Sequence, residues 1–149
     1  MEYILSFADS MKAVGIPIVK LQVNGHDGFF MVDTGSTGCH IDECFAKEIG
    51  AEEIQSSTKN TISLGGRTAV TNTYYLTFTF GEWELSEVKC TSSSMRVAQE
   101  HLLKKGIRMD GIIGVPMLSF LQAEINLKKF VLILNMPDMT EETDVKNQR

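Results

Sequence analysis

The chain has 149 residues, of which 43% are hydrophobic and 22% charged, which is the balance of a single soluble globular domain. Its formal net charge is −5, from 14 basic and 19 acidic residues, and no basic stripe runs through it, so we do not expect nucleic acid as a partner. The longest apolar runs, such as residues 130–134, fall far short of the ~20 residues needed to span a bilayer. No membrane association is therefore expected.

The three cysteines and the first residues bear on the compartment. An odd cysteine count without a disulfide framework fits a reducing environment. Glu2 stands where a secretory leader would carry basic residues, and the apolar stretch after it is short, so we expect no signal peptide. These features predict a cytoplasmic location, although a mature form that had lost its signal would have the same sequence.

The first third of the chain predicts a hairpin and a capped helix. Residues 1–15 show no clear pattern, and we treat them as an N-terminal extension of a domain that spans residues 16–136. Residues 16–23 alternate weakly in hydrophobicity and stop at Asn24-Gly25, a dipeptide typical of hairpin turns. Phe29–Val32 then predicts a short buried strand. Asp42 can cap a helix that runs through Ile49 and stops at Gly50.

The rest of the chain predicts a mostly β structure with two or three short helices. Two hairpins are expected from alternating runs around Gly65-Gly66 and Gly81-Glu82. Further elements are expected, in chain order, as a helix from Ser93 or Ser94 to Lys105, a short helix from Pro116 to Leu121, and paired strands over residues 123–127 and 130–134. The polar residues 137–149 predict a disordered tail.

The most informative stretch is Phe30–Val32 followed directly by Asp33-Thr34-Gly35-Ser36. A lone Asp-Thr-Gly is often no more than a turn, in which Asp and Gly serve the backbone. Here an apolar strand precedes the triplet, and a second apolar element, Ile112-Ile113-Gly114, follows Asp110-Gly111 much later in the chain.

This ordered set resembles the aspartic proteases, and above all the retropepsins and their cellular and bacterial relatives, over residues 16–134. The resemblance implies a single-domain, retropepsin-like acid protease fold with a closed, barrel-like β body. In that family, two apolar residues and a glycine, here Ile112, Ile113 and Gly114, thread beside the Asp loop as a ψ-loop. The expected helix after Asp42 favours the cellular or bacterial branch over the viral one.

The resemblance also implies a catalytic pair. In this protease class two carboxylates ~3 Å apart share one proton, because they cannot both ionise, and so act as base and acid at once. The resemblance assigns Asp33 to this pair. Since the chain has one Asp-Thr-Gly, the second carboxylate must come from a second copy in a symmetric homodimer. The expected function is an aspartic-type endopeptidase that hydrolyses extended peptide or protein substrates and needs no cofactor.

The residues around Asp33 are expected to support the active-site loop. Gly35 allows a close approach of the backbone, and the resemblance has the Thr34 hydroxyl reach across the two-fold axis. Ser36 is expected to hydrogen-bond the outer oxygen of Asp33 and thereby favour its ionised form. A substrate-covering flap is expected at the hairpin tip formed by Leu64, Gly65, Gly66 and Arg67, although these residues could form only a turn.

Other interpretations compete with these. The segment Cys39–Cys44 gathers potential metal ligands, but no second ligand pair exists downstream, so we expect no metal and interpret Cys39 and Cys44 as small buried residues beside the Asp loop. A Cys39–His40 nucleophilic pair is disfavoured because neighbours on an extended segment point to opposite faces. Asp110 could supply a carboxylate, but the resemblance gives it a structural role. The alternative function is a non-catalytic protease-fold module that dimerises or binds peptides.

Overall fold

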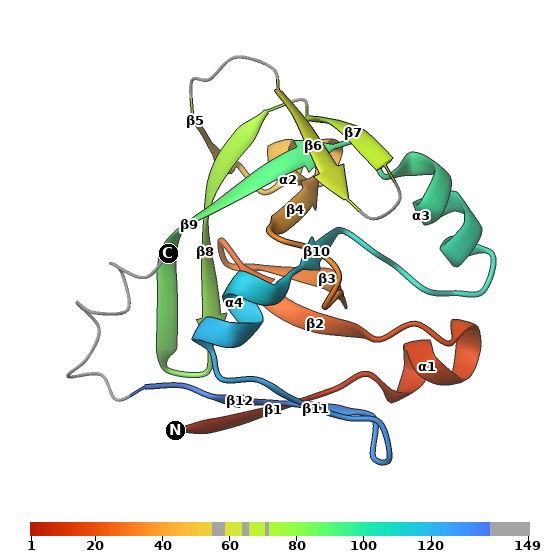
Figure 1. Ribbon diagram of the computed structural model, residues 1–149, viewed down its shortest axis with the longest axis vertical. Helices are drawn as coiled ribbons and strands as arrows, with labels where there is room; N and C mark the ends of the chain where they lie inside the picture. Colours follow the sequence, from red (N-terminus) through yellow and green to blue (C-terminus); the bar gives the residue numbers. More distant parts are fainter. Residues whose placement is uncertain (55–58, 64–65, 71, 138–149) are drawn as a thin grey trace.

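The computed structural model describes residues 1–54, 59–63, 66–70 and 72–137 (Figure 1). Its strands are β1 Glu2–Ser6, β2 Ile18–Val23, β3 His26–Val32, β4 Cys39–Asp42, β5 Glu52–Ile54, β6 Lys59–Ser63, β7 Gly66–Val70, β8 Thr73–Phe80, β9 Trp83–Ser93, β10 Gly111–Ile113, β11 Glu124–Asn126 and β12 Val131–Asn135. Its helices are α1 Ala8–Val14, α2 Glu43–Glu48, α3 Arg96–Leu103 and α4 Val115–Phe120. The expected mostly β fold with short helices is confirmed.

Six strands close into a barrel. The strand order is β2-β3-β10-β4-β9-β8, and β2 also pairs with β8, so the sheet returns on itself while β5 extends it beyond β8. A separate sheet, in the order β1-β12-β11, runs along the base of the barrel in Figure 1. The β6–β7 hairpin lies at the opposite end of the molecule in Figure 1, where β7 contacts β9.

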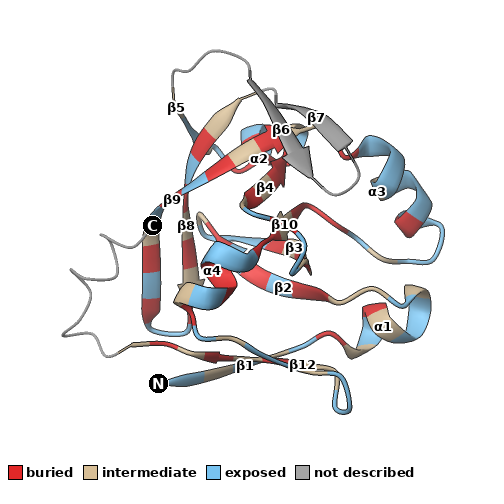
Figure 2. Ribbon diagram, in the orientation of Figure 1, coloured by how far each residue is buried: buried red, intermediate tan, exposed pale blue. Residues whose placement is uncertain are grey.

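Local sequence signals account for the turns and the strand faces. The β2–β3 turn has Asn24 at φ 48° and Gly25 at φ 79°, the left-handed pair that a tight hairpin requires. Buried and exposed residues alternate along β8 and β9, because one face of each strand points into the barrel (Figure 2). Phe30 and Phe78 meet there edge to face, with ring centroids 5.5 Å apart.

The expected helix after Asp42 is confirmed. The Asp42 side chain is buried; one carboxylate oxygen accepts from the Phe45 N–H and the other from the Met95 N–H, both at 3.1 Å. Because one carboxylate thus caps α2 and binds the N-cap residue of α3, it links the starts of the two helices.

The first fifteen residues contain two elements that the sequence pattern did not indicate. Strand β1 pairs antiparallel with β12, and the Met136 N–H donates to the Met1 carbonyl at 2.8 Å. Phe7 is fully buried and packs against Phe130, with ring centroids 6.1 Å apart. Residues 2–14 therefore pack as part of the same body as the barrel. The predicted tail, 137–149, lies outside the described residues except for its first position.

The cysteine interpretation needs correction. Cys39 and Cys90 are register partners on the parallel strands β4 and β9, with Cα atoms 4.8 Å apart, and form a disulfide. Cys39 is buried as expected, but the prediction that Cys44 is buried is wrong, because that residue lies on the outward side of α2 and is exposed. In the described parts of the chain, no helix is long and apolar enough to cross a membrane.

Candidate active site

The loop that carries Asp33 is held by the strand that passes beside it. Strand β10 inserts between β3, with which it runs parallel, and β4, with which it runs antiparallel, although β3 and β4 are consecutive in the chain. The Asp33 N–H donates to the Ile113 carbonyl at 3.0 Å, and the Val115 N–H donates to the Ser36 carbonyl at 2.9 Å. Strand β10, with the residues expected to form a ψ-loop, Ile112, Ile113 and Gly114, therefore lies beside the Asp loop and anchors it at two points.

Gly114 is required by this arrangement. A Cβ atom at this position would lie 2.5 Å from the carbonyl oxygens of both Ser36 and Gly38. Real Cβ atoms do not approach backbone oxygens so closely, so any larger residue would displace the Asp loop. The glycine therefore sets how near the ψ-loop and the Asp loop can lie.

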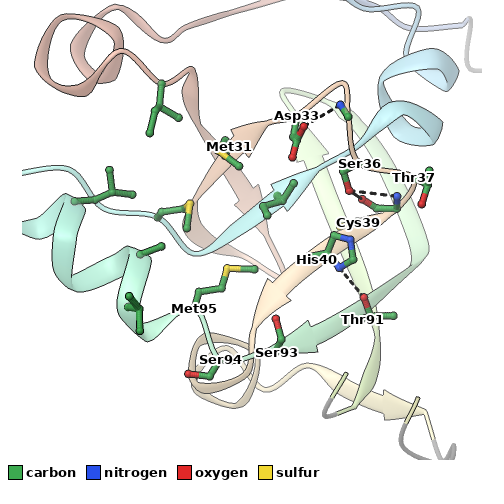
Figure 3. Close-up of a pocket in the computed structure, with 18 of the residues that line it drawn as sticks. Met31, Asp33, Ser36, Thr37, Cys39, His40, Thr91, Ser93, Ser94 and Met95 are labelled. Carbon is green, nitrogen blue, oxygen red and sulfur yellow. Dashed lines mark hydrogen bonds between the residues drawn. The ribbon is translucent and has the colours of Figure 1, made fainter. Parts of the chain in front are cut away.

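Asp33 faces a large cavity. The carboxylate is half-buried, and its Oδ1 accepts from the Gly35 N–H at 2.9 Å. The cavity has a volume of about 1080 Å³ and extends from the Asp loop along β4 and β9 to α3 (Figure 3). Among the lining residues that the structure describes, Asp33 is the only one with a carboxylate. Thr34 and Gly35 are exposed at the tip of the loop.

Ser36 differs from its expected contact. Its hydroxyl donates to the Gly38 carbonyl at 3.0 Å instead of to the Asp33 carboxylate (Figure 3). The side chain is buried under the loop, where it hydrogen-bonds the backbone of the turn that it belongs to. Ser36 therefore supports the loop by shaping its backbone.

Asp110 does not line the cavity, and its carboxylate is bound by a backbone N–H and by an arginine side chain. Its Oδ2 accepts from the Phe29 N–H at 2.9 Å, and the Arg108 guanidinium lies 3.1 Å from the same oxygen. Burial raises the pKa of Asp110, and these two partners only partly offset that effect. The contacts fit the structural role that the sequence implied.

His40 is a cavity residue whose place the sequence reasoning did not identify. Its Nδ1 lies 2.8 Å from the Thr91 hydroxyl oxygen. Burial lowers the pKa of His40, an effect that the nearby Asp33 charge partly offsets. The sequence indicated only two possible roles for His40, as a metal ligand or as a partner of Cys39, because the pairing of β4 with β9 cannot be inferred from local pattern. Among the described residues, no cluster of three or more metal-binding side chains occurs.

The expected flap falls partly outside the described residues. Strands β6 and β7 form an antiparallel hairpin in which Ser63 pairs with Gly66 and Ile62 with Arg67. Leu64 and Gly65, which would form its tip, lie outside the described residues. The hairpin itself is confirmed.

Comparisons with known proteins agree with this geometry. A profile of the aspartyl protease family matches residues 19–117. None of the curated proteins matches the chain in sequence. Among solved structures, the fold is similar to that of a retropepsin-like aspartic protease from Rickettsia conorii, with a TM-score of 0.57 and 21% identity over 91% of this chain and 90% of that chain.

Two other structures share the fold. The EIAV protease in complex with the inhibitor HBY-793 has a TM-score of 0.54 and 13% identity over 75% of this chain and 93% of that chain. The retroviral protease-like domain of Ddi1 from Leishmania major has a TM-score of 0.52 and 16% identity over 80% of this chain and 88% of that chain. At these identities the similarity establishes the retropepsin-like fold, as the sequence predicted.

Proposed function

The chain belongs to the aspartyl protease family, and on that premise we propose that it is an aspartic endopeptidase that works as a homodimer with one Asp33 from each copy. The observation that carries the proposal is the position of Asp33, which lies at the edge of a cavity where the described residues provide no other carboxylate, beside β10. Among the described residues its carboxylate accepts one hydrogen bond, from the Gly35 N–H, which leaves most of its acceptor capacity for a water or a second carboxyl group.

The proposed reaction needs only water and the two carboxyl groups. The ionised Asp33 removes a proton from the attacking water, while the protonated Asp33 of the second copy donates its proton to the carbonyl oxygen. The tetrahedral intermediate then collapses. The C–N bond breaks as the amine nitrogen takes the proton from the Asp33 that received it from water, while the other Asp33 takes a proton from a hydroxyl of the intermediate, which becomes the product carboxylic acid. The pair again holds a single proton. No cofactor takes part in these steps.

Exposed apolar residues on the terminal sheet and the exposed tip of the Asp loop support dimerisation. Ile4 on β1 is 57% exposed, and its register partner Ile133 on β12 is only half-buried, so this face of the terminal sheet carries exposed apolar surface. Thr34 and Gly35 are exposed at the loop tip, where a symmetric partner loop could meet them. Both features suit an isologous interface that includes the active site.

We also propose that the β6–β7 hairpin covers bound peptide as a flap, with Leu64, Gly65, Gly66 and Arg67 at its tip. An antiparallel hairpin at this point of the chain supports the idea. A peptide-derived inhibitor such as pepstatin should slow proteolytic nicking of the hairpin. Equal nicking with and without inhibitor would contradict a covering role.

The homodimeric active site can be tested by mixing subunits. Wild-type and Asp33→Asn chains are mixed in equal amounts under conditions of subunit exchange, and hydrolysis of a fluorogenic peptide library is measured. If each site needs two Asp33 residues, activity should fall to about one quarter, because only one dimer in four has both. A fall to one half would mean that each chain acts alone. No hydrolysis by pure wild type, together with peptide binding, would favour the non-catalytic module.

The cytoplasmic location stays a prediction. It rests on the odd cysteine count and on the residues at the start of the chain, whereas a Cys39–Cys90 disulfide is more typical of oxidising compartments. Acid quenching of intact cells, followed by denaturation of the protein, alkylation of its free thiols and mass spectrometry, distinguishes the two. A reducing compartment should give three modified cysteines and an oxidising one should give Cys44 alone.

A further inference from the structure

A row of four residues crosses the barrel beside Asp33. Met31 on β3 pairs with Ile112 on β10, Ile112 with His40 on β4, and His40 with Thr91 on β9. Register partners point to the same face of a sheet, and all four line the cavity. The row changes from apolar at β3 to polar at β9.

The polar end of the row continues along β9. Side chains two positions apart on a strand share a face, so Lys89 and Ser93 lie on the cavity side with Thr91, and all three line the cavity. The intervening Cys90 and Ser92 point the other way and are fully buried. Figure 3 shows Thr91 and Ser93 on this strand, with the His40 ring directed at Thr91.

This polar wall, made of His40, Lys89, Thr91 and Ser93, is rich in hydrogen-bond donors. Because the His40 Nδ1 is engaged by Thr91, the Nε2 is the ring nitrogen for which the described residues provide no partner. His40 is half-buried and lines the cavity. When the Thr91 hydroxyl donates to Nδ1, the ring proton lies on Nε2, which is then a donor.

The charged residues that line the cavity also favour a ligand rich in hydrogen-bond acceptors. Lys89 is exposed and forms no ion pair with any residue that the structure describes. Of the described lining residues, the other basic ones are His40 and His101, and the only acidic one is Asp33. An ammonium group beside hydroxyl and imidazole donors matches a carboxylate, which accepts at both oxygens. A neutral amide would bring donors of its own, and an apolar side chain would bury these groups without partners.

From this arrangement, and resting on the proposed peptidase function, we propose that the polar wall selects substrates with a glutamate or aspartate side chain close to the scissile bond. Lys89 pairs with that carboxylate, and His40 and the hydroxyls orient it. The apolar side of the cavity, which includes Met31 and Met95, receives a neighbouring apolar residue.

The test uses a fluorogenic octapeptide library in which one position at a time is fixed as Glu, Gln or Leu, at pH 7 and low salt. We expect one position at which Glu exceeds Gln in kcat/KM by about 10-fold, since a charge-assisted contact discriminates on this scale. The Lys89→Gln and Lys89→Met variants should bring that ratio close to one, and His40→Gln should lower it by less. Lys20→Gln is the matched control, because Lys20 is exposed on β2 and does not line the cavity. It should keep the wild-type ratio.

Binding of the same peptides, labelled with a fluorophore, separates this inference from the proposed function. Hydrolysis without a Glu preference, or a preference that persists in both Lys89 variants, overturns the inference and leaves the peptidase standing. Glu-dependent binding that Lys89→Gln abolishes, with no hydrolysis, supports the inference and overturns the peptidase. Neither binding nor hydrolysis by the folded protein overturns both.

Discussion

Asp33 and Asp110 both lie next to the paired strands β3, β10 and β4, but they differ in burial and in the number of partners that their carboxylates have. Asp33 follows β3, is half-buried, and accepts one hydrogen bond from its own loop. Asp110 precedes β10, is almost fully buried, and is held by the Phe29 N–H and the Arg108 guanidinium. The carboxylate that is left with free acceptor capacity is available for chemistry, whereas the one whose oxygens are taken up joins β3 to β10.

Asp33→Asn should separate the two aspartates most strongly. We expect hydrolysis to fall by at least about 100-fold, because an amide cannot act as general base, with no loss of stability. Asp110→Asn should keep most of the activity, since that group does not line the cavity. Initial rates and urea unfolding at one protein concentration check both. Residual activity above a tenth of wild type in Asp33→Asn would contradict the assignment.

Gly114→Ala should disturb the Asp33 region alone. The added methyl group would meet two carbonyl oxygens of the Asp loop, and we expect a loss of roughly 3 kcal/mol in the free energy of unfolding, with loss of activity. Gly38→Ala is the matched control in the same loop, because a Cβ there would meet nothing within 4 Å. Urea denaturation should place this control within about 0.5 kcal/mol of wild type. Equal stability of the two variants would mean that the loops are not packed as described.

Asp110→Ala should weaken the fold without touching the chemistry of Asp33. Removing the carboxylate leaves the Phe29 N–H without its partner, and we expect a loss of about 2 kcal/mol. Asp110→Asn should lose less, because its amide oxygen can still accept from Phe29. If the two substitutions cost the same, the backbone contact contributes nothing measurable.

The smallest expected effect is a change in the pKa of His40, which shows which of the two aspartates is close enough to influence it. Burial lowers the pKa of His40 below its ordinary value of 6.5, and the Asp33 charge works against that shift. Asp33→Asn should therefore lower the pKa of His40 further, and Asp110→Asn should leave it unchanged. Titration followed by NMR of the imidazole protons measures both. A rise in Asp33→Asn would contradict the proximity of the two groups.

The lowered pKa of His40 also makes the free energy of unfolding depend on pH. Below pH 6.5 the unfolded chain takes up a proton at His40 before the folded chain does, so stability contributed by this residue is lost as the pH falls from 6.5 toward the lower folded pKa. His40→Gln should therefore show a weaker decline in unfolding free energy across this range. An unchanged decline would mean that other groups account for it.

Local signals in the sequence predicted the features that depend on a few neighbouring residues. Asn24-Gly25 sets a hairpin turn and Asp42 caps a helix, and both act within four residues. The ψ-loop at Ile112–Gly114 was predicted because the family resemblance supplied the long-range pairing that local pattern lacks. The chemistry expected of Asp33 agrees with its place in the cavity and awaits the experiments above.

The features that sequence reasoning missed depend on contacts between distant strands or on the shape of a loop. Cys39 pairs with Cys90 across 51 positions, and His40 meets Thr91 on the same two strands. The hydroxyl of Ser36 had two possible acceptors within the loop, and only the loop geometry decides between Asp33 and Gly38. Strand register and loop shape are properties of the assembled barrel, so no short window of sequence contains them.

The pairing of β1 with β12 also means that the two partner strands are synthesised at very different times. Met1 and Met136, which hydrogen-bond each other, are 135 positions apart, so β1 leaves the ribosome long before its partner strand exists. At roughly 5–20 residues per second, this interval is on the order of ten seconds. Throughout it, β1 presents unpaired backbone groups and Phe7 lacks the surface of Phe130 that it will contact. A growing chain of this kind is exposed to wrong pairing, and to chaperones that bind extended apolar segments, until synthesis reaches β12.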